Sequence, residues 1–478
     1  MAARFRGLAI TFDDVLLEPS VSAVLPSDVK ISTQITKKIR INTPIISAAM
    51  DTVTESEMAI GLARQGGLGV IHRNFSIEQQ VEEVRRVKRS ESGVIKEPVT
   101  LYPSSTLEEA KLLMAQYGIS GIPIVNENKL KGILTERDLR LETNLSKKVG
   151  EVMTKEKITT ASVGTTLAQA EKILKKYKIE KLPIVDRKGM LRGLITWKDL
   201  TKIKSYPQAS KDKNGRFLVA AAIGVGEGFL KRAAVLVAGG VDVLVVDTSH
   251  AHHKNVLDAV PVLKKAFPKI QLIVGNVATA QATSDLVKRG VDAVKVGIGS
   301  GSICTTRDVA GVGVPQFTAI LECARAAKSL KVPVIADGGI VYPADITKAL
   351  VAGASAVMLG SMLAGTDEAP GDVIISSDGR RYKKYRGMGS YEAIRQRGHD
   401  RYFQKEVPEG ISGRVPYKGS VANVLKKLIA SLRTAMGYYG TAEIKDFWNV
   451  SYWQVTGAGM KESHPHTVIV DAQEETFH

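Results

Sequence analysis

The clearest chemistry in this sequence lies around Cys304, at the end of a glycine-rich segment that runs from Lys295 to Arg307. Glycines at 297, 299 and 301 let the backbone turn tightly and expose its N–H and C=O groups. Carbonyls that face inward can hold a monovalent cation, and amides that face inward can hold phosphate. A thiol among such groups, beside Thr305 and Thr306, can act as a nucleophile. The segment alone fits a small buried cysteine in a tight turn equally well. Cys323 lies in a helical stretch and is expected in the core.

Two further segments place polar groups directly after apolar runs. Asp337-Gly338-Gly339 follows one run, and Gly360-Ser361 follows another. Backbone amides at such positions can form a phosphate cup, and Asp337 can accept hydrogen bonds from ribose hydroxyls. Glycine turns that merely close strands are the simpler alternative. Both sites lie at the ends of predicted strands and downstream of the cysteine segment, which favours the functional interpretation.

Residues 365–420 form a long excursion rich in glycine and charge, with little apolar periodicity. Composition alone fits a lid over an active site and a mobile surface loop equally well. The histidines at 250, 252 and 253, and those at 464 and 466, lack convincing ligand spacing with carboxylates. We therefore expect these histidines to support neighbouring site residues or to lie on the surface, rather than to form a zinc site.

The elements that must position these residues are short apolar runs alternating with helical stretches. Continuous apolar strands between helices are typical of a parallel sheet covered on both faces. Eight such runs with polar residues at their C-terminal ends predict an α/β protein with a (β/α)8 TIM barrel. An open, doubly wound sheet is the alternative, but no Gly-x-Gly-x-x-Gly follows an early strand. The runs are Pro44–Ala48, Gly69–His72, Phe217–Gly224, Asp242–Asp247, Gln271–Asn276, Asp292–Gly297, Pro333–Asp337 and Ala356–Gly360.

An internal repeat interrupts this pattern after the second run. The segment Gly121–Asn126 is echoed by Lys181–Asp186, and Gly132–Asp138 by Gly193–Asp199, at spacings of 60 and 61 residues. Each unit is expected to contain a helix, two short strands and a second helix. We therefore divide the chain into a first barrel part (1–92), an inserted domain (93–205, with repeats at 93–150 and 151–205) and a second barrel part (206–478).

Composition excludes several classes of protein. The 478 residues are 44% hydrophobic and 24% charged, and only two are cysteines, which argues against disorder and against a disulfide scaffold. We find no signal peptide and no apolar run long enough for a bilayer, so we expect a cytoplasmic protein with no membrane. The net charge of +17 favours anionic ligands, but the basic residues are scattered and no nucleic acid is required.

Taken together, the motifs resemble the inosine-5′-monophosphate (IMP) dehydrogenase family over nearly the whole chain. The repeat is similar to the paired CBS modules (a Bateman domain) inserted in that family's barrel, and a mobile flap is expected at about 380–420. The matching motifs are Thr11–Pro19, Ser47–Glu55, Gly299–Thr306, Asp337–Gly339, Tyr385–Ser390, Arg401–Phe403 and Glu462–His466.

This resemblance implies NAD-dependent oxidation of IMP to XMP, the committed step of guanine nucleotide synthesis. Cys304 would form a covalent thioimidate, and Thr306, Arg401 and Tyr402 would activate the water that hydrolyses it. The residues that would bind IMP are Ser302, Asp337, Gly339, Gly360, Ser361, Tyr385, Gly387, Met388, Gly389 and Glu409. Those along the NAD site would be Asp247, Ser249, Asn276, Gly297 and Gly299.

The resemblance also implies a potassium ion on the carbonyls of Gly299, Gly301 and Cys304. Glu462, Ser463 and His464 of a neighbouring subunit would complete its shell, which implies a homotetramer. In the CBS pair, Thr135, Asp138, Thr196 and Asp199 stand where related modules hold adenine or guanine nucleotides, although helix capping would explain them too.

The sequence departs from the family pattern at two places. Only Lys405 and Glu406 separate Gln404 from Val407, so the flap segment is short. Ala48 stands where some relatives supply a serine to IMP.

Two other functions are compatible with parts of the sequence. GMP reductase shares the barrel and the cysteine loop, but Arg401, Tyr402 and the CBS insert argue against it. A catalytically inactive, nucleotide-sensing CBS protein is disfavoured by the intact Cys304, Thr306 and Asp337.

Overall fold

The computed structural model describes residues 5–90, 95, 98–140, 142–198, 200–201, 206–396 and 407–467. The chain forms two compact units. The first comprises Met1–Lys88, Gln208–Asp212 and Phe217–His478, and the second comprises Arg89–Pro207 and Lys213–Arg216.

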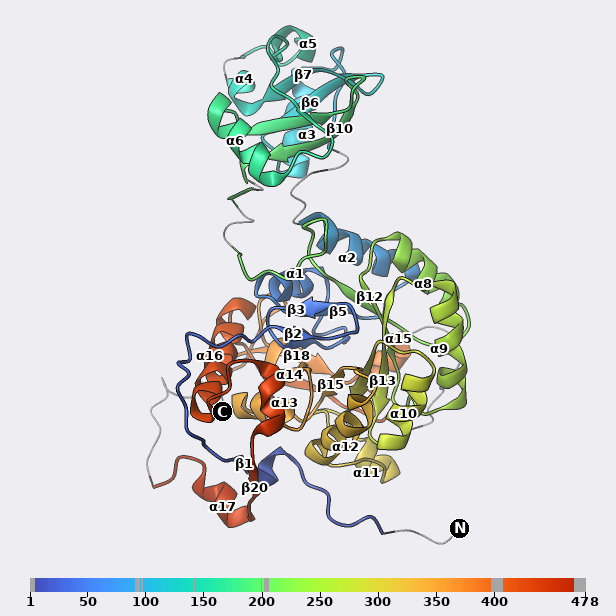
Figure 1. The fold of residues 1–478 in the computed structure, drawn as a ribbon. Helices are drawn as coiled ribbons and strands as arrows, with labels where there is room; N and C mark the ends of the chain where they lie inside the picture. The colour runs from blue at the N-terminus through green and yellow to red at the C-terminus, as the bar shows by residue number, and fades with distance from the viewer. Residues whose placement is uncertain are drawn as a thin grey trace. The chain divides into compact units, whose positions relative to one another are not determined.

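Eight strands of the first unit close into a parallel barrel, which confirms the predicted (β/α)8 fold (Figure 1). Each of the eight apolar runs in the sequence overlaps one of them: six runs contain the whole strand, whereas β5 begins one residue before its run and β13 ends one residue after its run. Around the barrel the order is β11-β12-β13-β14-β15-β16-β4-β5, so the chain enters at β4 and the last strand, β16, pairs with it. The strands are β4 (Ile45–Ser47), β5 (Leu68–Ile71), β11 (Ala220–Ile223), β12 (Val243–Asp247), β13 (Gln271–Val277), β14 (Ala293–Val296), β15 (Val334–Asp337) and β16 (Ala356–Leu359).

Helices follow these strands and cover the outside of the barrel. Their apolar residues pack on the strands, which are therefore buried on both faces and read as continuous apolar runs. No helix in the described ranges combines the length and the apolar character needed to cross a membrane. The covering helices are α1 (Ser56–Arg64), α2 (Ile77–Ser90), α8 (Phe229–Ala238), α9 (Lys254–Ala266), α10 (Ala280–Lys288), α12 (Gln316–Lys328), α13 (Pro343–Val351) and α16 (Val421–Tyr439). Two short helices, α11 (Thr306–Ala310) and α14 (Ser361–Ala364), lie in the segments after β14 and β16.

The interior of the barrel is a packed apolar core. Ile46, Leu68, Val245, Ile273 and Ile335 belong to one cluster of buried side chains. Strand residues point alternately into the barrel and toward the helices, so each strand contributes to both layers. The smaller elements of this unit are η1 (Phe12–Asp14), β1 (Val15–Leu17), β2 (Thr33–Gln34), β3 (Arg40–Ile41), α15 (Tyr391–Gln396), η3 (Ile444–Asn449), β20 (Tyr452–Gln454) and α17 (Gly457–Glu462).

Part of the segment that the sequence analysis described as an irregular excursion is a three-stranded antiparallel sheet. Strands β17 (Ile374–Ile375), β18 (Arg381–Arg386) and β19 (Ser412–Pro416) form it. The expectation was wrong there because β18 buries polar side chains, which hide its periodicity. Lys383 is buried and its ammonium donates to the backbone carbonyls of Thr366, at 3.0 Å, and Ala369.

The chain leaves and re-enters the first unit at one ion-paired point. Lys88, near the end of α2, donates to Asp212 at 3.2 Å and to Asp242 at 2.5 Å. Asp242 also accepts the backbone N–H of Val219, at 2.8 Å. These contacts lie at the N-terminal ends of β11 and β12, so they join the departing chain, the returning chain and the barrel.

The second unit repeats one pattern of elements with two separate apolar clusters. Thr106 and Thr166 cap equivalent helices, and each hydroxyl accepts a backbone N–H three residues on. Antiparallel pairs follow, β6 with β7 and β9 with β10. The elements are α3 (Leu107–Tyr117), β6 (Gly121–Asn126), β7 (Lys129–Thr135), α4 (Glu136–Arg140), α5 (Val149–Val152), β8 (Ala161–Ser162), α6 (Leu167–Tyr177), β9 (Lys181–Val185) and β10 (Leu191–Thr196).

Candidate active site

A cavity of about 260 Å³ opens at the C-terminal ends of the barrel strands. This is the face on which loops of (β/α)8 enzymes carry their chemistry. Most of the candidate site residues line it, although they come from segments up to about 160 positions apart. They are Ser249, Asn276, Gly297, Gly299, Gly301, Ser302, Cys304, Thr306, Asp337, Gly339, Gly360, Ser361, Tyr385, Gly387, Met388, Gly389 and Glu409.

Cys304 lies in this cavity at the end of a chain of hydrogen bonds. Its Sγ is 3.2 Å from Oγ1 of Thr306, and that hydroxyl donates to Oε2 of Glu409 at 2.8 Å. A hydroxyl carries one proton, so Thr306 accepts from the thiol while it donates to the carboxylate. The three side chains therefore form a path along which a proton can move from sulfur toward a carboxylate.

Backbone hydrogen bonds hold the cysteine loop against two other segments. The N–H of Ile411 donates to the carbonyl of Ile303 at 3.0 Å, and the N–H of Thr305 donates to that of Glu409 at 3.3 Å. On the other side, Gly387 donates to Ile411 at 2.9 Å. The chain around Glu409 therefore lies between the cysteine loop and the end of β18.

Lys295 is a buried cation beneath the cavity, at the end of β14. Its ammonium contacts Asp247 at 2.9 Å and Asp337 at 2.5 Å, and it donates to Oδ1 of Asn276. Burial alone would lower the pKa of Lys295, but the two carboxylates raise it above its ordinary value. One lysine thus ties together the ends of β12, β13, β14 and β15. With both carboxylates and the ammonium charged, the cluster carries a net charge of −1.

Asp337 is oriented by these contacts. Both Lys295 and Nδ2 of Asn276, at 3.0 Å, bind its Oδ2. Neither of these bonds involves Oδ1, which can accept hydrogen bonds from a ligand's hydroxyls. The backbone carbonyl of Asp337 accepts from Gln316 at 3.1 Å and from Ser300 at 3.2 Å.

Two glycines are required by close approach rather than by flexibility alone. A Cβ on Gly297, at φ +150°, would lie 1.9 Å from the carbonyl oxygen of Asp337. A Cβ on Gly360 would lie 2.6 Å from the hydroxyl of Tyr385. Any larger residue would therefore push apart the loops that line the cavity.

Tyr385 projects from β18 toward the same wall. Its hydroxyl is 3.8 Å from Sδ of Met50. Burial raises the pKa of Tyr385 to about 12, although hydrogen bonds with Ser302 and the backbone of Ser361 oppose the rise. The phenol therefore stays protonated at neutral pH and can serve as a hydrogen-bond donor.

Some predicted residues lie elsewhere. Asp247 does not line the cavity, but it contacts Lys295 beneath it. Glu462, Ser463 and His464 lie at the end of α17, away from the cavity of their own chain. In the second unit, Asp138 accepts from the backbone and the hydroxyl of Thr135, both at 2.8 Å, and Thr196 ends β10. Arg401, Tyr402 and Asp199 lie outside the described residues.

Several residues of the site were not predicted from the sequence, and Lys295 is the most important of them. Its signal was a lysine inside an otherwise apolar strand. Ala48 lines the cavity, so its methyl group takes the place of the expected hydroxyl. The other lining residues are Met50, Ile298, Ser300, Ile303, Gly338, Ile340, Val341, Met358 and Leu359.

Comparison with known proteins adds to this geometry. A model of the IMP dehydrogenase / GMP reductase domain matches residues 9–466. The chain is 56% identical to inosine-5′-monophosphate dehydrogenase of Aquifex aeolicus over 477 residues, which are 98% of this chain and 97% of that protein. This chain belongs to the IMP dehydrogenase / GMP reductase family. It is also 53% identical to the enzyme of that name from Bacillus subtilis, over 99% of each chain.

A solved structure corrects one argument from the sequence. The chain is similar to a cysteine-to-alanine variant of GMP reductase from Trypanosoma brucei, solved with guanosine 5′-monophosphate, with a TM-score of 0.91 and 39% identity. The match covers 97% of this chain and 98% of that one. The inserted unit therefore does not separate IMP dehydrogenases from GMP reductases within this family, contrary to our expectation.

Proposed function

We propose that this protein oxidises IMP to XMP with NAD, at Cys304. The observation that carries the proposal is the chain from Cys304 through Thr306 to Glu409, inside a cavity that also holds Asp337. A nucleophile bonded to a proton path is what covalent attack on a purine ring requires. The names of relatives at 52–56% identity support the same activity.

In this proposal the walls of the cavity bind IMP. Oδ1 of Asp337 accepts from the ribose hydroxyls, because its other oxygen is bound to Lys295 and Asn276. Backbone amides of Gly339, Gly360 and Ser361, with Ser302 and the phenol of Tyr385, bind the phosphate. The segment Gly387–Gly389 and Glu409 face the base, which lies over Cys304.

The reaction then runs in two stages on one sulfur. The thiol passes its proton through the hydroxyl of Thr306 to Glu409, and sulfur adds to C2 of the hypoxanthine ring. C2 then gives up a hydride to NAD+, which leaves a thioimidate on Cys304. Water attacks the same carbon, the C–S bond breaks, the two protons of the water pass to the ring nitrogen and to the sulfur, and XMP departs. We propose that Thr306, Arg401 and Tyr402 activate this water.

NAD supplies the hydride acceptor when it is bound. We place it along Ser249, Asn276, Gly297 and Gly299, with Asp247 toward its ribose. The structure fits this cofactor in one respect: Lys295 holds Asp247 and Asn276 in fixed positions beside Asp337.

The cysteine loop also fits a potassium ion. The carbonyl of Gly301 accepts one hydrogen bond, from Cys304 at 3.0 Å, and a carbonyl has a second lone pair for a cation. We propose that carbonyls of Gly299, Gly301 and Cys304 hold potassium, with Glu462, Ser463 and His464 of a neighbouring subunit in a homotetramer. The ion would fix the shape of the loop.

We further propose that the second unit is a CBS pair that responds to adenine or guanine nucleotides. Thr135, Asp138, Thr196 and Asp199 are its candidate ligands. The contact of Asp138 with Thr135 also caps α4, so binding would have to compete with that bond. We expect the protein to act in the cytoplasm.

The test is formation of NADH from IMP and NAD+, followed by absorbance, with and without K+. Cys304→Ala should abolish it, whereas Cys323→Ala, which changes a buried core cysteine, should leave activity close to wild type. Intact-mass spectrometry of quenched enzyme should show a nucleotide adduct that Cys304→Ala lacks. A folded wild-type protein that forms neither NADH nor adduct would refute the proposal.

GMP reductase is the second candidate, because a structure of that enzyme matches nearly the whole chain. The same assay decides between them. Consumption of NADPH with GMP, and no NADH from IMP, would favour the reductase.

A further inference from the structure

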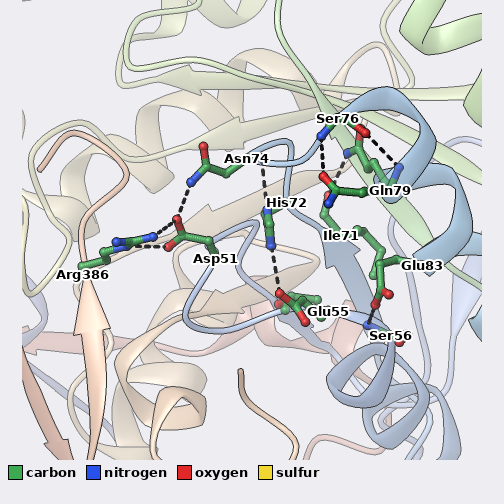
Figure 2. Close-up of polar contacts among 12 residues, drawn as sticks. Asp51, Glu55, Ser56, Ile71, His72, Asn74, Ser76, Gln79, Glu83 and Arg386 are labelled. Atoms are coloured by element: carbon green, nitrogen blue, oxygen red, sulfur yellow. Dashed lines mark hydrogen bonds and ion pairs between the residues drawn. The ribbon is translucent and has the colours of Figure 1, made fainter. Parts of the chain in front are cut away.

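A network of polar side chains lies at the C-terminal ends of β4 and β5, next to the cavity but outside its lining (Figure 2). Asp51 follows β4, His72 and Asn74 follow β5, and Arg386 ends β18. Figure 2 shows the guanidinium of Arg386 and the amide of Asn74 both directed at the carboxylate of Asp51. These groups take no part in the reaction proposed above.

The centre of the network is a two-pronged ion pair. Nε of Arg386 donates to Oδ1 of Asp51 at 3.0 Å, and Nη2 donates to Oδ2 at 2.7 Å. Only 7% of the Asp51 side chain and 10% of the Arg386 side chain are exposed. Desolvating two charges is costly, so a pair this buried must be held in one geometry by its surroundings. Nδ2 of Asn74 adds a third bond to Asp51, at 2.6 Å.

Asn74 is in turn fixed by a buried histidine. Nδ1 of His72 accepts the backbone N–H of Asn74 at 3.1 Å, so a neutral ring carries its proton on Nε2. That nitrogen is 3.5 Å from a carboxylate oxygen of Glu55, and the ring stacks on Phe75. Side-chain contacts therefore hold the turn after β5 where it meets Asp51.

The residues next to the ion pair meet inside the cavity. Successive residues of a strand point to opposite faces, so Arg386 faces Asp51 while Tyr385 faces the cavity. There the Tyr385 hydroxyl meets Met50, the residue before Asp51. The backbone N–H of Arg386 also donates to Oγ1 of Thr52, at 3.2 Å. The ion pair thus sets the register in which β18 meets the loop after β4.

The residues after Arg386 connect the ion pair to Glu409 and Thr306 through hydrogen bonds. Gly387 donates to Ile411, and the carbonyl of Gly389 accepts from the N–H of Glu409 at 3.1 Å. The carboxylate of Glu409 in turn accepts a hydrogen bond from the hydroxyl of Thr306.

We infer that Asp51 and Arg386 are a positioning pair for the nucleotide substrate, which act through Tyr385 and the backbone of Gly387–Gly389. The pair holds one wall of the cavity in the geometry that binds the nucleotide. This inference rests on the proposed function.

The test compares Asp51→Asn, Arg386→Gln and the double variant in the IMP assay. Asn keeps an oxygen for Asn74 but gives up the charge. We expect each single variant to raise KM for IMP roughly tenfold while KM for NAD changes less than about twofold. Because both residues act through one contact, their effects should not add. KM for IMP of the double variant should not exceed that of the more impaired single variant. Glu392→Gln is the matched control, since Glu392 touches Arg386 at 3.5 Å from a half-exposed position, and it should not change KM for IMP.

The thermal unfolding midpoint and calorimetric IMP affinity of each variant accompany the kinetics. If Asp51→Asn does not fold, Arg386→Lys is measured instead. Lysine keeps the positive charge but cannot make the two parallel hydrogen bonds to Asp51. An unchanged KM for IMP, or equal losses for IMP and NAD that follow the unfolding midpoint, would overturn the inference. Absence of NADH from wild type would count against the proposed function alone, because IMP affinity still reports on the pair.

Discussion

Replacing Lys295 by methionine tests whether this residue supports catalysis in addition to stabilising the barrel. Met has a similar length and no charge, so Asp247 and Asp337 would be left facing each other across the space that the ammonium occupied. Removing one partner of a buried ion pair costs about 3–5 kcal/mol of unfolding free energy. The cluster would lose its positive charge on the side where both ribose groups are proposed to bind, and the two facing carboxylates would repel each other.

The catalytic loss follows from the same displacement. If about 3 kcal/mol of that cost appears as lost transition-state stabilisation, kcat/KM falls roughly 150-fold. Because Lys295 touches residues assigned to NAD as well as Asp337, KM for both substrates should rise. NADH formation across a matrix of IMP and NAD concentrations gives these constants, and the unfolding midpoint gives the stability.

Lys264→Met is the matched control. Lys264 pairs with Asp292 at 2.6 Å, at the opposite end of the same strand, β14. It should lower the unfolding midpoint but keep kcat/KM within about threefold of wild type, since it lies far from the cavity face. A folded Lys295→Met protein that retains wild-type kcat/KM would refute the role given to Lys295.

Four other changes test separate parts of the structure. Tyr385→Phe should raise KM for IMP roughly tenfold through one lost hydrogen bond; because the pKa of Tyr385 is raised to about 12, its ionisation should produce no change in the wild-type rate up to pH 10. Gly297→Ala should abolish activity, because its Cβ would lie 1.9 Å from the carbonyl of Asp337; an active variant would contradict the close approach. Although burial opposes ionisation of Asp51, the Arg386 guanidinium holds the pKa of that carboxyl below its ordinary 3.8. The stability that this pair contributes is therefore fully present above about pH 4 and lost as the pH falls below 3.8 toward the lowered pKa, so acid titration of the unfolding midpoint should be flatter for Asp51→Asn. Thr166→Ala removes the cap of α6 and should lower the stability of the second unit by about 1 kcal/mol, visible in its hydrogen exchange, without changing kcat/KM in the absence of nucleotides.

The eight barrel strands could be predicted because each is a short run of apolar residues that the fold buries on both faces. The cysteine loop could be recognised for a similar reason, since its glycines and hydroxyls are local in sequence. Contacts between distant segments could not be predicted in this way. Asp51 and Arg386 are 335 positions apart, and nothing near either one specifies the other.

Buried charged side chains were the second feature that could not be predicted from the sequence. Lys295 and Lys383 lie in strands where periodicity predicts apolar or exposed residues, yet both are buried and satisfied by oxygens from other elements. A hydropathy pattern scores each as a break in a strand. Only the three-dimensional arrangement shows that the ammonium groups hold loops together.

The ion pairs of Lys88 with Asp212 and Asp242 have a consequence for how this chain can be assembled and altered. Through these ion pairs, one side chain contacts both ends of the inserted segment, at the face of the barrel opposite the cavity. Strands β5 and β11 can therefore pair as immediate neighbours, with Ala220 beside Val70, however much polypeptide lies between them. The barrel should accept a short linker, or an unrelated domain, in place of the inserted segment without a change in the register between β5 and β11.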